Sequence, residues 1–160
     1  LTPQYAIFLS FGDGHLFING THMPIGPFPR NMPPYIGYCL VESSLEASEL
    51  CLHVHQAMPL DDLETFLIGT DGLTDLMRVE EKSIPGQSKL VGPISQFWQD
   101  DRLFKNPDIV RRRLSLINRD HLRFDRKTFR PVRANGHLSD DTTLVVGRRH
   151  TQPINPTSLT

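Results

Sequence analysis

The chain has 160 residues, of which 38% are hydrophobic and 22% charged, and its formal net charge is −1. This length suits one domain, which can bury enough surface to fold without disulfides or a structural metal. No apolar run reaches the roughly 20 residues that a membrane-spanning helix needs, and no secretory signal is visible, so we expect a cytoplasmic protein with no membrane partner.

Five segments have the apolar, β-branched composition or the alternation of β-strands. They are residues 5–11, 15–18, 35–41, 50–54 and 65–69. Asn19-Gly20 favours a tight hairpin turn, and the short connection between the last two segments favours antiparallel neighbours. Residues 24–34 include five prolines, so we expect a stiff, ordered loop there.

Helical spacing follows in the second half of the chain. Leu73, Leu76 and Met77 predict a short helix, and Asn106-Pro107 predicts the start of a longer one. Residues 142–146 predict a final strand, whereas 121–136 show no clear period. Strands, then helices, then one last strand are typical of an α+β fold, which we expect over residues 1–149, with a disordered tail at 150–160.

The charge is distributed unevenly. Residues 1–99 carry four bases and eleven acids, whereas residues 100–133 carry eleven bases and five acids. Such asymmetry can indicate a nucleic-acid-binding domain that uses the Arg-rich segment 102–133. We favour the plainer interpretation, in which the arginines form the solvent-exposed faces of amphipathic helices, so a nucleic-acid partner is not expected.

Acidic residues stand at the ends of three predicted strands. Asp13 and Asp71 each follow a strand and precede a glycine, Asp140 precedes the last strand, and Asp75 lies one helical turn beyond Asp71. Carboxylates that converge from neighbouring strand ends suit hard cations such as magnesium or manganese. Turn acids and helix caps are the alternative for each residue taken alone.

The two cysteines are too few for a disulfide framework, so a reducing compartment is expected. Cys51, His53 and His55 alternate on one face of a predicted strand and are ligand types that suit zinc. Because no fourth ligand is evident, we favour an ordinary strand face.

Three motifs follow one another along the chain: FGDG at 11–14, TDGLTDLM at 70–77 and SDDTTLVV at 139–146. Their order and spacing resemble the C-terminal part of the metal-dependent protein phosphatase family (protein phosphatase 2C, or PPM-type), in its bacterial-like branch. The resemblance implies that Asp71 and Asp140 bind the catalytic metal pair, and that Asp13 and Asp75 bind an additional ion.

The resemblance also implies a fold and an activity. Family members are antiparallel β-sandwiches flanked by helices (αββα), with a variable flap where residues 24–34 lie. They hydrolyse phosphoserine and phosphothreonine in protein substrates, using two manganese or magnesium ions and a metal-bound water. In such a site the carboxylates hold ions and none acts as a nucleophile.

This sequence departs from the family pattern at several points. Asp141 stands where the family has asparagine, and Thr74 replaces a bulky aromatic residue. The family's earlier Asp-Gly-x-x-Gly motif, which supplies the metal-bridging aspartate, is not found. We therefore expect an incomplete N-terminal part of the domain and a chain that is inactive alone. The alternative is a catalytically silent binding or sensing module of the same fold.

Overall fold

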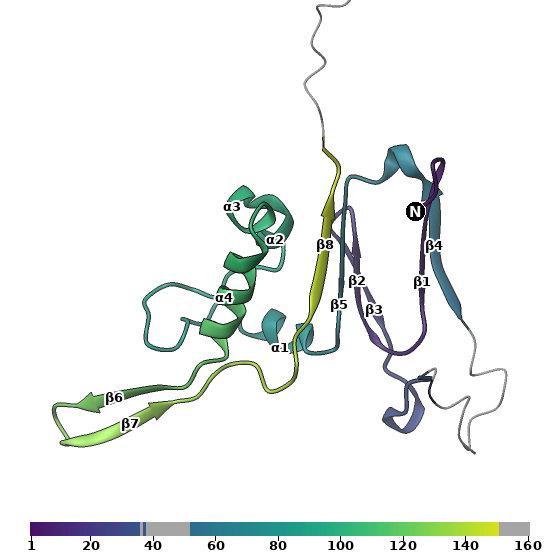
Figure 1. Cartoon of the computed structure of the whole chain (residues 1–160). Coiled ribbons are helices and arrows are strands. Elements are labelled where there is room, and N and C mark those ends of the chain that lie inside the picture. The colour runs from purple at the N-terminus through teal and green to yellow at the C-terminus, as the bar shows by residue number, and fades with distance from the viewer. Residues whose placement is uncertain (36, 38–51, 151–160) are drawn as a thin grey trace, which may run out of the picture.

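The computed structural model describes residues 1–35, 37 and 52–150 and shows an α+β fold with antiparallel sheets (Figure 1). Most of the strand predicted at 35–41, the start of the one at 50–54, both cysteines and nearly all of the predicted tail lie outside the described residues. Within the described ranges, no helix has the length and apolar character needed to cross a bilayer.

A four-stranded antiparallel sheet forms the centre of the molecule (Figure 1). Its strands, in spatial order, are β3 (Thr21–Ile25), β2 (Gly14–Ile18), β5 (Thr65–Gly69) and β8 (Leu144–Arg148). The predicted hairpin turn is confirmed, because Asn19 and Gly20 join β2 to β3 with φ angles of 49° and 80°.

A second sheet pairs β1 (Tyr5–Ser10) with β4 (His53–Pro59). Its inward residues Ala6 and Phe8 pack in one buried cluster with Leu16 and Ile18 of β2, so the two sheets face each other as a sandwich. The prediction that the strands now seen as β4 and β5 are neighbours is wrong. They belong to different sheets, because the short helix η3 (Leu60–Asp62) carries the chain from one to the other.

The helices lie on the face of the four-stranded sheet that is turned away from β1 and β4 (Figure 1). They are α1 (Leu73–Arg78), α2 (Gln96–Gln99), α3 (Asp101–Phe104) and α4 (Pro107–Ile117); a short η1 (Pro29–Asn31) lies apart from them. The predicted start of α4 is confirmed, since the Asn106 side chain accepts hydrogen bonds from the backbone N–H groups of Asp108 and Ile109.

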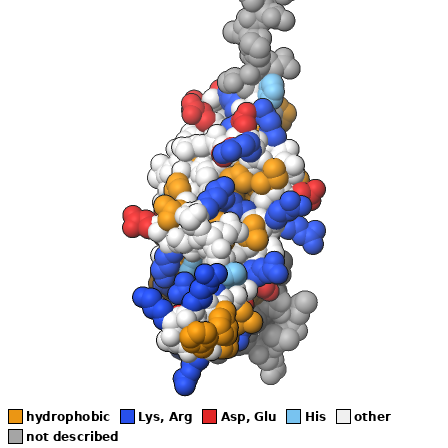
Figure 2. Space-filling model, turned by 90° about the vertical axis from the view of Figure 1, so that its left-hand side faces the viewer, with side chains coloured by type: hydrophobic (Ala, Val, Ile, Leu, Met, Phe, Trp, Pro, Cys, Tyr) orange, Lys and Arg blue, Asp and Glu red, His pale blue; other side chains and the backbone are white. Residues whose placement is uncertain are grey.

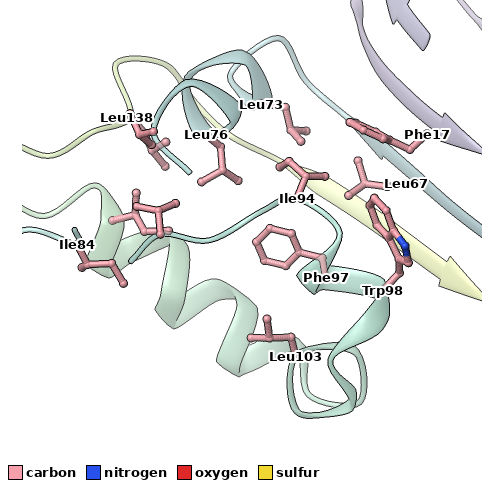
Figure 3. Close-up of a cluster of buried hydrophobic side chains, with 13 residues drawn as sticks. Phe17, Leu67, Leu73, Leu76, Ile84, Ile94, Phe97, Trp98, Leu103 and Leu138 are labelled. Carbon is pink, nitrogen blue, oxygen red and sulfur yellow. The ribbon is translucent and has the colours of Figure 1, made fainter. Parts of the chain in front are cut away.

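The main core joins this helical layer to the sheet (Figure 3). Phe17 and Leu67 from the sheet meet Leu73 and Leu76 of α1, and Phe97 fills the space between α1 and α4. Leu73, Leu76 and Leu67 are fully buried. This packing fixes where α1 begins, and therefore where the acidic residues around it lie.

A hairpin of β6 (His121–Asp125) and β7 (Arg130–Ala134) projects from the helical side (Figure 1). The sequence showed no clear period here. The structure explains this, because the side chains on both faces of the ribbon are largely exposed and no single face needs to be apolar.

Candidate functional site

The strand registers bring the three acidic motifs to one end of the central sheet. His15 at the start of β2 pairs with Gly69 at the end of β5, and Gly69 pairs with Leu144 at the start of β8. Because these neighbours are antiparallel, the start of β2, the end of β5 and the start of β8 coincide. Asp13 directly precedes β2, Asp71 lies two residues after β5 and Asp140 lies four residues before β8. Residues more than a hundred positions apart therefore lie near one end of the sheet.

The second and third motifs are joined by direct backbone contacts. The Thr70 hydroxyl donates to the Asp141 carbonyl at 2.9 Å and accepts from the Thr143 N–H at 3.1 Å. Gly72 packs so closely that a Cβ there would lie 2.7 Å from the Asp141 carbonyl oxygen. The glycine of the second motif is thus required by its contact with the third.

The Asp75 side chain, from α1, accepts hydrogen bonds from Ser139, the first residue of the third motif. Asp75 Oδ2 accepts the Ser139 backbone N–H at 2.9 Å and also the Ser139 hydroxyl. The Ser139 hydroxyl, then its N–H, lower the pKa of Asp75 below the ordinary range for a carboxyl group. Asp75 is therefore ionised at neutral pH and fixes the residue next to Asp140.

A cavity of about 470 Å³ opens beside this end of the sheet. Asp13 and Asp71 line it together with Thr74 and Arg78. The cavity is also lined by the end of β3, through Pro24 and Ile25, and by the proline-rich segment that follows it, through Gly26, Pro27, Phe28 and Pro33. The first two residues of the predicted loop thus belong to a strand at the edge of the sheet. Two of the four predicted carboxylates share one cavity, and the segment compared with the family's flap contributes to its wall.

A histidine pair, which sequence reasoning missed, lies at this cavity: His15 lines it, and His22 contacts His15. His15 is only 8% exposed; its Nδ1 lies 3.0 Å from His22 Nε2 and its Nε2 lies 2.8 Å from the Thr74 hydroxyl. Burial, and then the neighbouring His22, lower the pKa of His15, and burial lowers the pKa of His22. The only sequence signal was a histidine directly after the first motif.

Each predicted carboxylate also accepts a hydrogen bond within the protein. Asp71 Oδ1 accepts the Gly72 N–H at 3.0 Å and Asp140 Oδ1 accepts the Asp141 N–H at 2.8 Å, which are local bonds of the kind that turn acids make. Asp13 Oδ1 instead accepts the hydroxyl of the distant Tyr35 at 3.0 Å. These bonds use one oxygen of each carboxylate, and they hold Asp13 and Asp71 at the cavity.

The donor type suits a hard cation, since carboxylate oxygens are what manganese and magnesium prefer. The number of donors is smaller than a complete site needs. Among the residues that the structure describes, no group of three or more His, Cys, Asp or Glu side chains is placed to hold a metal ion. For the zinc alternative, Cys51 lies outside the described residues, and His55 Nε2 lies 2.7 Å from the Ser10 hydroxyl.

Comparisons with known proteins returned no match among family models, curated proteins or solved structures. The phosphatase resemblance therefore depends on the three sequence motifs alone.

Proposed function

We propose that this protein belongs to a metal-dependent phosphatase that hydrolyses phosphoserine and phosphothreonine in cytoplasmic proteins. One observation carries the proposal. The antiparallel registers of β2, β5 and β8 gather the three acidic motifs at one end of the sheet, beside a cavity that contains two of their carboxylates. Acids that only stabilised their own turns would have no need to lie at the same end of the sheet.

The residues take distinct roles in this proposal. Asp71 and Asp140 are ligands of a catalytic pair of Mn²⁺ or Mg²⁺ ions, and Asp13 and Asp75 are ligands of an additional ion. Bound ions of this kind supply charge neutralisation at phosphate and an acidified water. The chain itself contributes orientation, because Asp75 holds Ser139 and Gly72 packs on Asp141. Arg78, whose guanidinium lies 3.8 Å from the Asp75 carboxylate, adds a positive charge at the cavity that suits a phosphoryl group.

A catalytically silent module of the same fold is the second candidate. It is favoured by the absence, among the described residues, of three metal-binding side chains in one place. In this case the cavity would bind a phosphorylated partner through Arg78 without hydrolysing it.

Manganese binding tests the assignment of the carboxylates. Electron paramagnetic resonance of free Mn²⁺ should show weak binding by this chain, and Asp71→Asn and Asp140→Asn should weaken it further. Asp61→Asn is the matched control, because the Asp61 side chain is 97% exposed and lies in η3, outside the motifs. Equal binding by all four proteins would refute the assignment.

Activity separates the two candidates. Phosphate release from phosphoserine and phosphothreonine peptides should be measured with Mn²⁺ and with Mg²⁺, using the protein as its gene encodes it. Turnover that Asp71→Asn and Asp140→Asn abolish supports the enzyme. Peptide binding without turnover supports the silent module. Robust turnover by residues 1–160 would contradict the prediction that this chain is inactive alone.

A further inference from the structure

The β6–β7 hairpin is a strongly basic projection of the described surface. Residues 119–134 contain six bases and two acids, a net charge of +4. Figure 1 shows the ribbon extending away from the core, on the side of the molecule opposite to β1. Figure 2 views this side directly and shows an apolar patch at the lower end of the molecule, bordered by Lys and Arg side chains.

The strand register separates the ribbon into two faces. Leu122 and Phe124 lie opposite Arg133 and Pro131, and cross-strand partners share a face, so one face is mainly apolar. Phe129 joins this face at the tip, where its ring contacts Phe124 with centroids 6.3 Å apart. Phe124 and Phe129 are 62% and 77% exposed, so the largest side chains of the hairpin are in solvent.

The cations surround this apolar tip. Arg126 and Lys127 occupy the turn between the two phenylalanines, and Arg123 and Arg130 lie on the opposite face. Both acids are engaged within the hairpin: Asp120 accepts hydrogen bonds from Arg133 and the Gly136 N–H, and Asp125 accepts one from the Lys127 N–H. Asp120 anchors the base of the ribbon and leaves its tip to project.

The turn holds Phe129 in an unfavourable conformation. Its φ is +53°, a region that glycine and asparagine adopt easily and a bulky aromatic residue rarely does. Phe129 is 77% exposed, and its contact with Phe124, itself 62% exposed, buries little of the ring, so the fold gains little from a phenylalanine at this position. Such an outlier points to a role for the ring outside the molecule.

We propose, contrary to the expectation from the sequence that the protein has no membrane partner, that the β6–β7 hairpin docks on an anionic lipid surface. Phe124 and Phe129 enter the interface, and the flanking cations contact acidic headgroups. An apolar tip ringed by Lys and Arg has the chemistry of peripheral membrane anchors. A nucleic acid fits less well. Single strands need a groove that follows the backbone, and reading of duplex bases needs polar side chains. Phe124 and Phe129, however, line neither of the two cavities at the base of this ribbon and project at its tip.

Vesicle co-sedimentation of the whole chain tests this docking. Vesicles of phosphatidylcholine with phosphatidylglycerol should bind the protein, and vesicles of phosphatidylcholine alone should bind it much more weakly. Phe129→Asn should reduce binding about tenfold because an aromatic side chain leaves the interface. It should fold at least as well as the parent, since asparagine accepts positive φ. Arg126→Glu should reduce binding about fivefold or more.

Two controls match these changes. Tyr5→Asn removes an exposed aromatic ring from β1, on the other side of the molecule, and Lys105→Glu reverses an exposed charge next to α3. Both should leave vesicle binding unchanged. Equal binding to neutral and anionic vesicles, or equal losses from the controls and the hairpin variants, would overturn the proposal. So would absent vesicle binding together with hairpin-dependent binding of a labelled single-stranded oligonucleotide.

Discussion

The contact between Gly72 and the third motif gives the sharpest prediction about the site. Gly72 has helical backbone angles, so alanine meets no conformational penalty there. Its Cβ, however, would lie 2.7 Å from the Asp141 carbonyl oxygen and 2.8 Å from the Thr142 hydroxyl oxygen. Neither distance is tolerable, and because the nearer atom belongs to the backbone, the 140–142 segment must move.

The size of the effect follows from two opposing terms. Overpacking costs about 1–3 kcal/mol, and replacing glycine by alanine at compatible angles returns about 0.4–1 kcal/mol. Gly72→Ala should therefore lower the free energy of unfolding by about 1–2 kcal/mol. For a chain of this length that corresponds to a melting temperature lower by about 2–8 °C. Scanning calorimetry measures the shift, and Mn²⁺ titration measures the displacement of Asp140 as weaker binding.

A matched glycine separates stability from site geometry. A Cβ at Gly20 would have no neighbouring atom within 4 Å, but the φ angle of this residue is +80°. Gly20→Ala should cost about 1–2 kcal/mol through backbone strain alone and leave Mn²⁺ binding unchanged. If Gly72→Ala keeps parental stability and parental Mn²⁺ binding, the contact with Asp141 does not position the third motif, and the reasoning fails.

Three further predictions concern charge and packing. In the folded protein the pKa values of His15 and His22 lie below the ordinary value of 6.5, so below pH 6.5 the unfolded chain binds more protons than the folded protein does. The free energy of unfolding, measured with urea, should therefore fall as the pH drops below about 6.5. It should fall less steeply with pH in His22→Asn. Ser139→Ala should raise the pKa of Asp75, as followed by NMR titration, and cost about 1 kcal/mol through the lost hydrogen bond. Leu76→Ala should cost about 2–5 kcal/mol in chemical denaturation, since Leu76 is fully buried; a loss below 1 kcal/mol would contradict the packing described.

Local chemistry made part of the fold predictable. The Asn19-Gly20 turn and the Asn106 cap depend on residues adjacent in sequence, and both are confirmed. The α+β class is also confirmed, because the order of strand and helix patterns decides it. Of the expected αββα layers, the described residues contain both sheets and helices on one side.

Long-range pairing could not be predicted in the same way. The strands β4 and β5 were expected to pair because they are close in sequence, but η3 carries the chain between sheets. The sequence of β1 does not show which face of this strand is inward. Ala6 and Phe8 are buried, but Tyr5, Ile7 and Leu9 on the other face are also hydrophobic although they are exposed. A strand that is apolar on both faces has no period to show which face is inward.

The candidate site was predictable from the sequence only in part. Strand-end acids were recognised from sequence, and the register of β2, β5 and β8 shows that their strand ends coincide. The histidine pair was missed because its two members are joined by a hairpin pairing: Phe17 pairs with His22, and this places the His22 ring beside that of His15. No sequence motif marks such a contact.

The local and functional interpretations of the acids need not compete. Asp75 accepts two hydrogen bonds from Ser139, which a structural acid would do, and the same bonds fix the backbone directly before Asp140. Sites that bind metal ions depend on outer hydrogen bonds to orient their ligands, and a ligand oxygen left unsupported binds poorly. The turn bonds of Asp71 and Asp140, and the bond from the Tyr35 hydroxyl to Asp13, each use one oxygen and hold the carboxylate in a defined orientation. An acid held in this way is therefore preorganised to bind a metal ion. The presence of a turn bond does not distinguish a purely structural acid from a metal ligand. Loss of Mn²⁺ binding in Asp71→Asn does distinguish them.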